Sequence, residues 1–260
     1  MAGLKNSLLN IWGSDVYVYP YESKINFKII KKNLRYYNYV ASTSHCMAKQ
    51  AASLVDRKYY ITPFGVDTNR FKPVRAGCKN GSFVVGTVKT LSPIYGIEDS
   101  IKAFNVFIKR LKQEGMCKES EKIIYEIYGR GESAVELQSL INELNLENNV
   151  KLCGYVQNGK LPEIYNNFDV FICNSLSESF GVAAVEAMAC GVPVVVSDAD
   201  GFKEVVEDNV TGFVVPRGDV EATANGIYKL YKNSVLRKSF GEEGVKRVES
   251  LYNWDCNVST

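Results

Sequence analysis

The sequence of 260 residues predicts an α/β protein built around a doubly wound, Rossmann-like parallel sheet. The first observation behind this prediction is that short β-branched runs alternate with helical patterns from residue 83 onward, which is typical of repeated β-α units. The second is that the strand pattern at 192–196 is apolar throughout, as in sheets that helices cover on both faces. The sequence therefore predicts a core sheet between two helical layers.

The elements of this larger part follow from hydrophobic periodicity. Strands are predicted at the β-rich runs 82–88, 122–129, 150–156, 169–175, 192–198 and 211–216. Helices are predicted at the periodic segments 97–112, 135–146, 161–168, 180–190, 202–208, 220–231 and 234–252. The helical period is clear at 97–112, where apolar residues at positions 97, 101, 104, 108 and 111 fall on one face.

The first 67 residues form a separate pattern. The segment "LLNIWGSDVYVY" reads as a strand leading into a loop, and further strands are predicted at 36–44 and 58–67, with a helix near 46–55. This piece offers too few strands for a complete sheet, so we expect the rest of its domain to lie upstream or in a separate N-terminal half. We predict a partial domain at 1–67, a polar, Gly/Pro-punctuated linker at 68–82 and a second domain at 83–260.

Charge excludes one large class of function. The formal net charge of +2 gives no sign of a nucleic-acid binder. The basic residues of the linker are interpreted as solvated charge rather than a binding stripe; they are Arg70, Lys72, Arg75 and Lys79.

The cysteines and the hydropathy pattern indicate the compartment. No two of the seven cysteines are spaced as a metal or redox pair, and Cys153, Cys173 and Cys190 lie in apolar runs typical of core residues. Such thiols suit a reducing compartment, so we expect a cytoplasmic protein. No apolar stretch reaches the ~18 residues of a membrane helix, which leaves a soluble protein or one peripheral to the membrane. The single histidine, His45, is predicted to start a helix at the surface.

Two glutamates stand out in "SLSESFGVAAVEAMACGVPVVVSD" at 175–198. Glu178 falls in the loop after a predicted strand, at the sheet edge where open parallel sheets bind ligands. Gly181 opens the next helix, whose N-terminal N–H groups are suited to a phosphate. Glu186 lies within that helix, among Ala and Val residues. The layout suits a sugar nucleotide, which presents sugar hydroxyls, a diphosphate and ribose hydroxyls.

Each glutamate also has a purely structural interpretation. Glu178 is acidic and near a helix N-terminus, where it would stabilise the helix by about 0.3–1 kcal/mol. Glu186 has almost no polar helix face around it, so it must be paired or line a cavity. We favour the functional interpretation for both.

The quoted segment, with its E-x(7)-E spacing, resembles the retaining glycosyltransferases of GT-B fold, specifically glycosyltransferase family 4. The segments "ASTSHCMAKQ" and "ITPFGVDTNRFKP" resemble the end of that family's first domain and its hinge. The segments "VVGTVKTLSPIYGIEDSIKAF", "YGRGE" and "DGFKEVVEDNVTGFVVPRGD" resemble its donor-binding domain. The resemblance implies a truncated first domain, transfer of a hexose-type sugar with retention, and cell-surface polysaccharide biosynthesis.

The resemblance also implies roles for single residues. Glu178 would hold hydroxyls of the donor sugar, and Lys89 would stand against the diphosphate as the leaving group gains charge. The other residues implied in donor binding are Ser177, Phe180, Gly181, Val182 and Glu186, with Glu186 on the ribose. No metal or other cofactor is expected beyond the nucleotide-sugar donor. The implied acceptor is a glycan or lipid-linked sugar.

Two departures from the family pattern leave alternatives open. Ile94 stands where a second basic residue is common, and the glycine pair before "EVV" is Asp200–Gly201 here. Together with the expected truncation, Ile94 supports a second interpretation, a non-catalytic nucleotide-sugar binding module. A sugar-nucleotide epimerase is a weaker third interpretation, because the 175–198 segment is more similar to a transferase.

Overall fold

The computed structural model describes residues 6–74 and 81–258. In the first part, three parallel strands pair in the order β1-β2-β3. The elements of this part are β1 (Leu8–Ile11), α1 (Ser14–Tyr17), α2 (Tyr19–Glu22), α3 (Lys24–Tyr36), β2 (Tyr39–Ser42), α4 (His45–Leu54) and β3 (Tyr60–Ile61). Its small core lies between the strands and the helices, with Val16, Leu34 and Met47 buried.

The second part holds six parallel strands in the order β6-β5-β4-β7-β8-β9. The strands are β4 (Phe83–Val88), β5 (Ile123–Tyr128), β6 (Val150–Gly154), β7 (Val170–Cys173), β8 (Val194–Ser197) and β9 (Gly212–Val215). The helices are α5 (Ile97–Gln113), α6 (Cys117–Ser120), α7 (Ala134–Glu143), α8 (Leu161–Asn167), α9 (Val182–Ala189), α10 (Asp200–Val205), α11 (Val220–Lys232), α12 (Ser234–Leu251) and α13 (Trp254–Val258), with short 3₁₀ turns at Pro93–Tyr95 and Asn158–Lys160.

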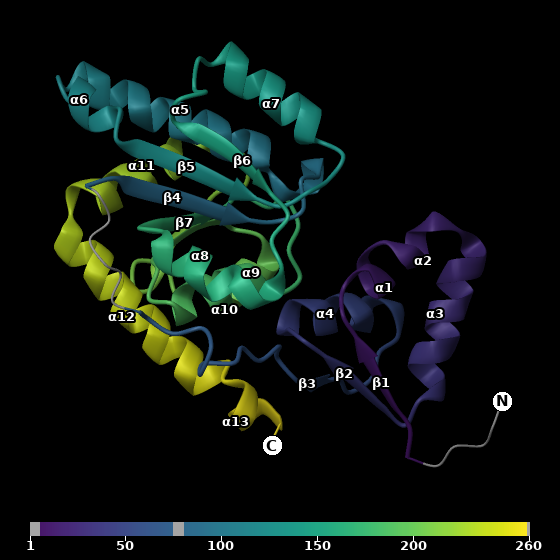
Figure 1. The fold of residues 1–260 in the computed structure, drawn as a ribbon. Helices are drawn as coiled ribbons and strands as arrows, with labels where there is room; N and C mark the ends of the chain where they lie inside the picture. The colour runs from purple at the N-terminus through teal and green to yellow at the C-terminus, as the bar shows by residue number, and fades with distance from the viewer. Residues whose placement is uncertain (1–5, 75–80, 259–260) are drawn as a thin grey trace.

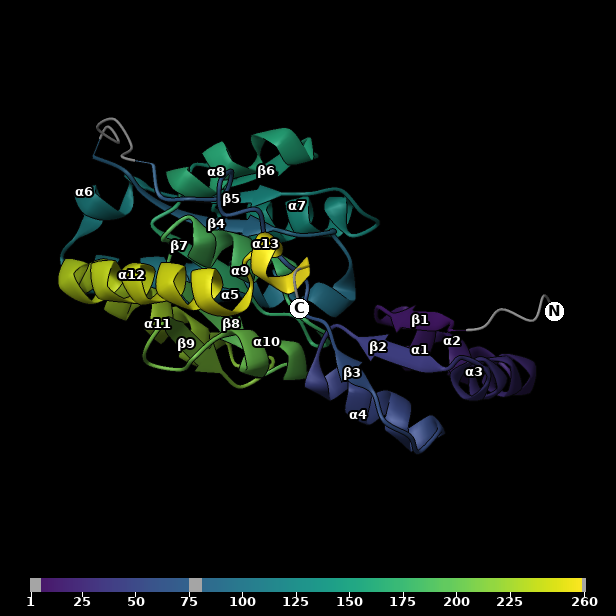
Figure 2. The ribbon, with the colours of Figure 1, turned by 90° about the horizontal axis from the view of Figure 1, so that it is seen from below.

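The larger sheet is covered on both faces, which confirms the doubly wound α/β prediction. Side chains of α5, α7 and α11 pack on one face in one buried cluster, and side chains of α8, α9 and α10 pack on the other. Figure 1 shows these two helical layers, with the three-stranded part set to one side of the larger body. Figure 2 shows the same arrangement from below, with α12 running along the larger sheet.

The chain crosses back at its C-terminal end to the segment between the two sheets. The amide of Val66 donates to the carbonyl of Tyr252 over 2.7 Å, and the amide of Trp254 donates to the carbonyl of Val66 over 3.1 Å. The two sheets fall on either side of the predicted linker 68–82, of which residues 75–80 lie outside the described residues. Arg70 and Lys72 are exposed, whereas the predictions for Arg75 and Lys79 fall outside the described residues.

Two sequence predictions need correction, and one helix was missed. The predicted loop after the first strand is helical, since α1 and α2 follow β1 directly. Cys153 is exposed rather than part of the core, because β6 is an edge strand, whereas Cys173 and Cys190 are buried as predicted. The helix α3 was not predicted.

No helix in the described part of the chain combines the length and apolar character needed to cross a membrane.

Candidate functional site

The candidate site lies where the strand order of the larger sheet reverses. The chain passes from β4 outward to β6 and then returns to β7, which pairs with the other side of β4. The carboxyl ends of two such strands open a crevice, because their following loops turn in opposite directions. Lys89 follows β4 directly, and the loop Leu176–Gly181 follows β7. We call this loop the donor loop, after the role that the sequence resemblance predicts for it.

Lys89 and Glu178 form an ion pair in this crevice. The Lys89 Nζ lies 2.5 Å from the Glu178 Oε2, and the two side chains are only 16% and 12% exposed. The ammonium also lies over the Tyr95 ring, 4.4 Å from its centroid. Burial alone lowers the pKa of Lys89, but interactions with Cys173 and Glu178 outweigh it and raise this pKa above its usual value. Lys89 is therefore a fixed positive charge at the crevice.

Glu186 is paired, as its apolar surroundings require. Tyr165 of α8, itself fully buried, donates its hydroxyl to the Glu186 Oε2 over 2.8 Å. Burial raises the pKa of the Glu186 carboxyl, while the Tyr165 hydrogen bond and the charges of Arg70 and Lys89 oppose that rise. Glu186 thus lies within electrostatic reach of Lys89, the cation that pairs with Glu178.

The start of α9 lies between the two glutamates. Gly181 precedes the helix with φ of +104°, and a Cβ there would come within 2.7 Å of the Phe202 ring, so both backbone and space require glycine. Among the described residues, no side chain caps this helix, which leaves its first N–H groups to an anion. Val182 is exposed at this end, and so is Ser177 in the donor loop.

Phe180 has a different environment from its neighbours. Its ring is buried and packs edge-on against Phe64 and Tyr252, with centroids 5.5 Å away in both cases. The side chain therefore anchors the donor loop, and only the backbone of Phe180 is available to a ligand.

A cavity of about 420 Å³ adjoins Lys89. Its lining residues come from the loops after β4, β5 and β6; they are Val88, Lys89, Thr90, Tyr128, Gly129, Arg130, Tyr155, Val156, Asn158 and Leu161. Arg130 lies over the ring of Tyr155, 4.8 Å from its centroid. The flat ring and the guanidinium offer stacking surfaces for a planar group.

A larger cavity, of about 850 Å³, lies between α5 and α7. Five carboxylate residues line it: Glu98, Asp99, Glu132, Glu136 and Glu143. Such a lining repels a diphosphate, whereas the smaller cavity is lined by the cations Lys89 and Arg130.

Two other residues singled out in the sequence, Ile94 and His45, both lie at the surface. Ile94 is 43% exposed in the 3₁₀ turn before α5, and His45 is exposed at the start of α4, as predicted. No group of three or more His, Cys, Asp and Glu side chains within residues 6–74 and 81–258 is arranged to hold a metal.

Sequence reasoning missed three residues at the site. Tyr165 holds Glu186, Tyr95 lies under Lys89, and Arg217 donates to the Leu176 carbonyl over 3.2 Å at the start of the donor loop. Tyr165 alone carried a signal, because a tyrosine predicted to be buried in a helix needs a partner for its hydroxyl.

Comparison with known proteins decides the family. A family model described as "Glycosyl transferases group 1" matches residues 69–247, which is more than half of the chain. The chain belongs to this glycosyltransferase family. It is 31% identical over 179 residues to the amylovoran biosynthesis glycosyltransferase AmsK of Erwinia amylovora, covering 66% of this chain and 42% of AmsK. It is 29% identical over 195 residues to the capsular polysaccharide biosynthesis glycosyltransferase CapM of Staphylococcus aureus, covering 73% of this chain and 47% of CapM.

The solved structure of Anabaena HepE in complex with UDP and glucose matches with a TM-score of 0.81 and 22% identity, covering 97% of this chain and 69% of HepE. Together with the described sheets, this likeness confirms the GT-B fold, with a six-stranded domain and a partial Rossmann-like one. The chain spans less than half the length of both AmsK and CapM.

Proposed function

We propose that residues 83–260 form the nucleotide-sugar binding domain of a retaining glycosyltransferase that transfers a hexose to a glycan or lipid-linked acceptor. The observation that carries the proposal is the gathering of Glu178, Glu186 and Lys89 at the strand-order reversal, beside the uncapped start of α9. An ammonium and free helix N–H groups suit a diphosphate, and carboxylates on either side suit hydroxyl groups.

In this proposal each group has one task. Lys89 and the first N–H groups of α9 hold the diphosphate and stabilise the negative charge that the leaving group gains. Glu178 accepts hydrogen bonds from the sugar, and Glu186, held by Tyr165, accepts them from the ribose. Ser177 and Val182 border the sugar and the diphosphate. The donor is the only small molecule required, and the acceptor takes the sugar from the side of the three-stranded part.

The cavity beside Lys89 provides a place for the base. Arg130 and Tyr155, which stack on each other, line this cavity together with Lys89, whereas no donor loop residue lines it. HepE supports UDP as the first nucleotide to test, because its solved complexes contain UDP and UDP-glucose. The biosynthetic roles of AmsK and CapM support a cell-surface polysaccharide as the product.

The stereochemistry of donor cleavage tests this function. We expect the chain to transfer glucose slowly from UDP-glucose to methanol as a simple acceptor, giving methyl α-glucoside, whose anomeric configuration is fixed and is read by proton NMR. Formation of methyl β-glucoside would contradict retention. Binding of the donor with neither transfer nor hydrolysis over many hours would favour the non-catalytic binding module.

Replacement of Ile94 tests how far the diphosphate site extends. Ile94→Lys is expected to tighten UDP binding about tenfold, because an exposed cation at this turn adds one charged hydrogen bond to the phosphates. Calorimetric titration measures the effect, with Ile94→Gln as the uncharged control. Equal affinity of the lysine and glutamine variants would show that this turn does not reach the phosphates.

We also propose that the protein contacts the membrane peripherally through α3. The helix carries five cations and no acid, namely Lys24, Lys28, Lys31, Lys32 and Arg35. Ile25 and Ile29, one turn apart, are 70% and 41% exposed beside these charges. In Figures 1 and 2, α3 lies on the side of the small part farthest from the larger body. A basic face with exposed apolar residues is suited to anionic lipid.

Vesicle sedimentation tests the membrane contact. The chain is expected to sediment with phosphatidylglycerol vesicles and not with pure phosphatidylcholine. Lys28→Glu with Lys32→Glu should lower binding more than tenfold, since each cation near an anionic surface contributes about 1 kcal/mol. The exposed pair Lys238→Glu with Lys246→Glu on α12 is the matched control. Equal binding of both double variants would rule out α3 as the contact.

A further inference from the structure

The first turn of α4 is bound by a side chain from the larger domain. The Glu204 carboxylate of α10 accepts hydrogen bonds from the His45 amide over 2.8 Å and from the Cys46 amide over 2.5 Å. The third amide, that of Met47, donates to the hydroxyl of Ser44, the residue before the helix, over 3.2 Å. A helix N-terminus carries partial positive charge, so this bidentate carboxylate is an electrostatic contact between the two domains.

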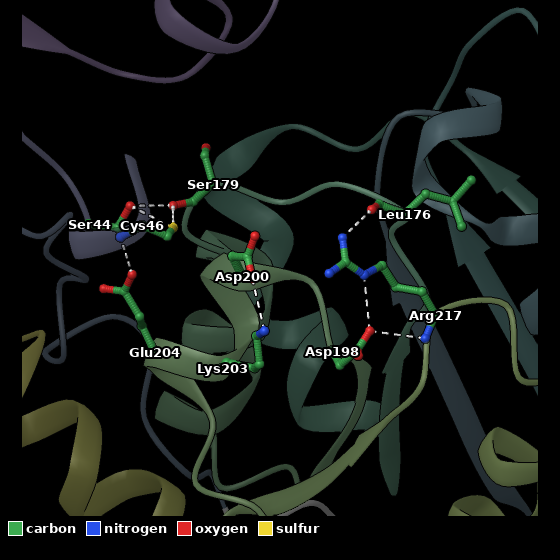
Figure 3. A network of polar contacts seen from close by, with 9 residues as sticks. All are labelled: Ser44, Cys46, Leu176, Ser179, Asp198, Asp200, Lys203, Glu204 and Arg217. Carbon is green, nitrogen blue, oxygen red and sulfur yellow. Dashed lines mark hydrogen bonds and ion pairs between the residues drawn. The ribbon is translucent and has the colours of Figure 1, made fainter. Parts of the chain in front are cut away.

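The same end of α4 also holds the donor loop. The Ser44 hydroxyl donates to the Ser179 carbonyl over 2.6 Å, and Figure 3 shows this bond beside the Glu204 contact. Ser44 is 1% exposed, so water does not compete for its hydroxyl. The aromatic side chains reinforce the link, because Trp12 packs edge-on against Phe64, which in turn packs against Phe180.

One short helix connects both contacts to Glu178. Gly201 and Glu204 are three residues apart in α10 and so lie on the same side of it. The Gly201 amide donates to the Glu178 carbonyl over 2.9 Å, and a Cβ on Gly201 would come within 2.4 Å of the Phe180 amide. The backbone around Glu178 and Ser179 is thus fixed by α10 on one side and by the first domain on the other.

We propose that Glu204 and Ser44 are positioning residues that couple domain contact to donor binding. When the start of α4 is docked on Glu204, Ser44 holds Ser179, and the loop keeps Glu178 against Lys89. When the contact opens, the donor loop loses the hydrogen bond that the first domain provides at Ser179. The donor site is then complete only while the two domains touch. This inference rests on the proposed function, because it assigns these residues a role at the same site.

Donor affinity measured in single and double variants tests the coupling. Calorimetric titration with UDP-glucose is expected to give about tenfold weaker binding for Glu204→Ala, which removes charged hydrogen bonds, and about fivefold weaker binding for Ser44→Ala, which removes a neutral one. The double variant should bind no more weakly than Glu204→Ala does, since both substitutions open the same contact. Glu204→Asp is expected to recover part of the affinity, and Lys203→Ala, an exposed neighbour on α10, should bind as the unaltered chain does.

Hydrogen exchange in the unaltered chain gives a readout that needs no variant. Coupling is reciprocal, so UDP-glucose should slow exchange at the amides of His45, Cys46 and Met47, which lie in the first domain. Thermal unfolding of each variant shows that titrations are made on folded protein. The coupling alone would be overturned if the Glu204 and Ser44 variants bound the donor with unchanged affinity and the donor did not change exchange at these amides. Absence of donor binding to the folded, unaltered chain would instead overturn the proposed function and the coupling with it.

Discussion

Replacing Lys89 with methionine is expected to weaken UDP binding roughly 30- to 100-fold, the largest effect of any single change in the donor site. Methionine keeps most of the side-chain volume but removes the ammonium that pairs with Glu178 and acts electrostatically on Glu186. A charged hydrogen bond to phosphate contributes about 1.5–3 kcal/mol, and its loss also leaves Glu178 to repel the diphosphate. Calorimetric titration with UDP and with uridine separates the phosphate contribution, because uridine affinity should not change.

The Lys89→Met variant is also expected to be less stable. A double variant distinguishes this loss of stability from the loss of UDP binding. Breaking a largely buried pair leaves Glu178 without a counter-charge, which is expected to cost about 3 kcal/mol in the free energy of unfolding. Adding Glu178→Gln removes that charge and should restore most of the stability without restoring UDP affinity. If UDP affinity returned with stability, Lys89 would be a structural residue.

Replacing Glu186 with alanine is expected to weaken nucleotide binding about 10- to 100-fold while the fold persists. The carboxylate is proposed to accept hydrogen bonds from the ribose, each worth about 1.5–3 kcal/mol when the acceptor is charged. Titration with UDP-glucose measures the loss, and the 2′,3′-dideoxyribose analogue is the matched ligand. That analogue should bind the alanine variant and the unaltered chain equally, and a difference between them would place Glu186 away from the ribose.

Acidification and Tyr165→Phe provide two further checks on Glu186. Burial raises the pKa of this carboxyl above that of an exposed glutamate, so the free site becomes protonated at a higher pH. Affinity for UDP-glucose should therefore fall as pH decreases through this raised pKa, and Glu186→Gln should lack that step. Tyr165→Phe removes the hydroxyl that holds Glu186 and should weaken binding less than Glu186→Ala does. A larger loss in the phenylalanine variant would mean that Tyr165 contacts the nucleotide itself.

The sequence predicted the larger domain well, because its elements are long and strongly periodic. All five apolar positions predicted for one face of α5 are buried, from Ile97 to Leu111. The apolar run of β8 is buried on both faces, as its pattern indicated. In α3 the exposed Ile25 and Ile29 lie on the side of the helix opposite Phe27, Ile30 and Leu34. Apolar residues therefore fall on two faces, which obscured the helical pattern in the sequence.

The candidate site was predictable in part for a similar reason. Glu186 stood out because a carboxylate among Ala and Val residues has few structural explanations. Glu178 and Gly181 stood out because they follow a predicted strand and open the next predicted helix. The partners of these residues were not predictable from local pattern, since Lys89 is 89 positions from Glu178 in the chain. The contact of Glu204 with the Cys46 amide spans 158 positions and depends on how two domains meet. The sequence likewise did not distinguish a central strand from an edge strand, which is why Cys153 of β6 was wrongly predicted to be buried.

The central claim is that the strand-order reversal between β4 and β7 forms a nucleotide-sugar site. Calorimetric titration of the purified chain with UDP, GDP, ADP and their common hexose conjugates tests it most directly. The account predicts that one nucleoside diphosphate binds in preference to the others, that its sugar conjugate also binds, and that Lys89→Met abolishes most of this affinity. A folded chain that binds none of these nucleotides, or binds them equally well without Lys89, would contradict it.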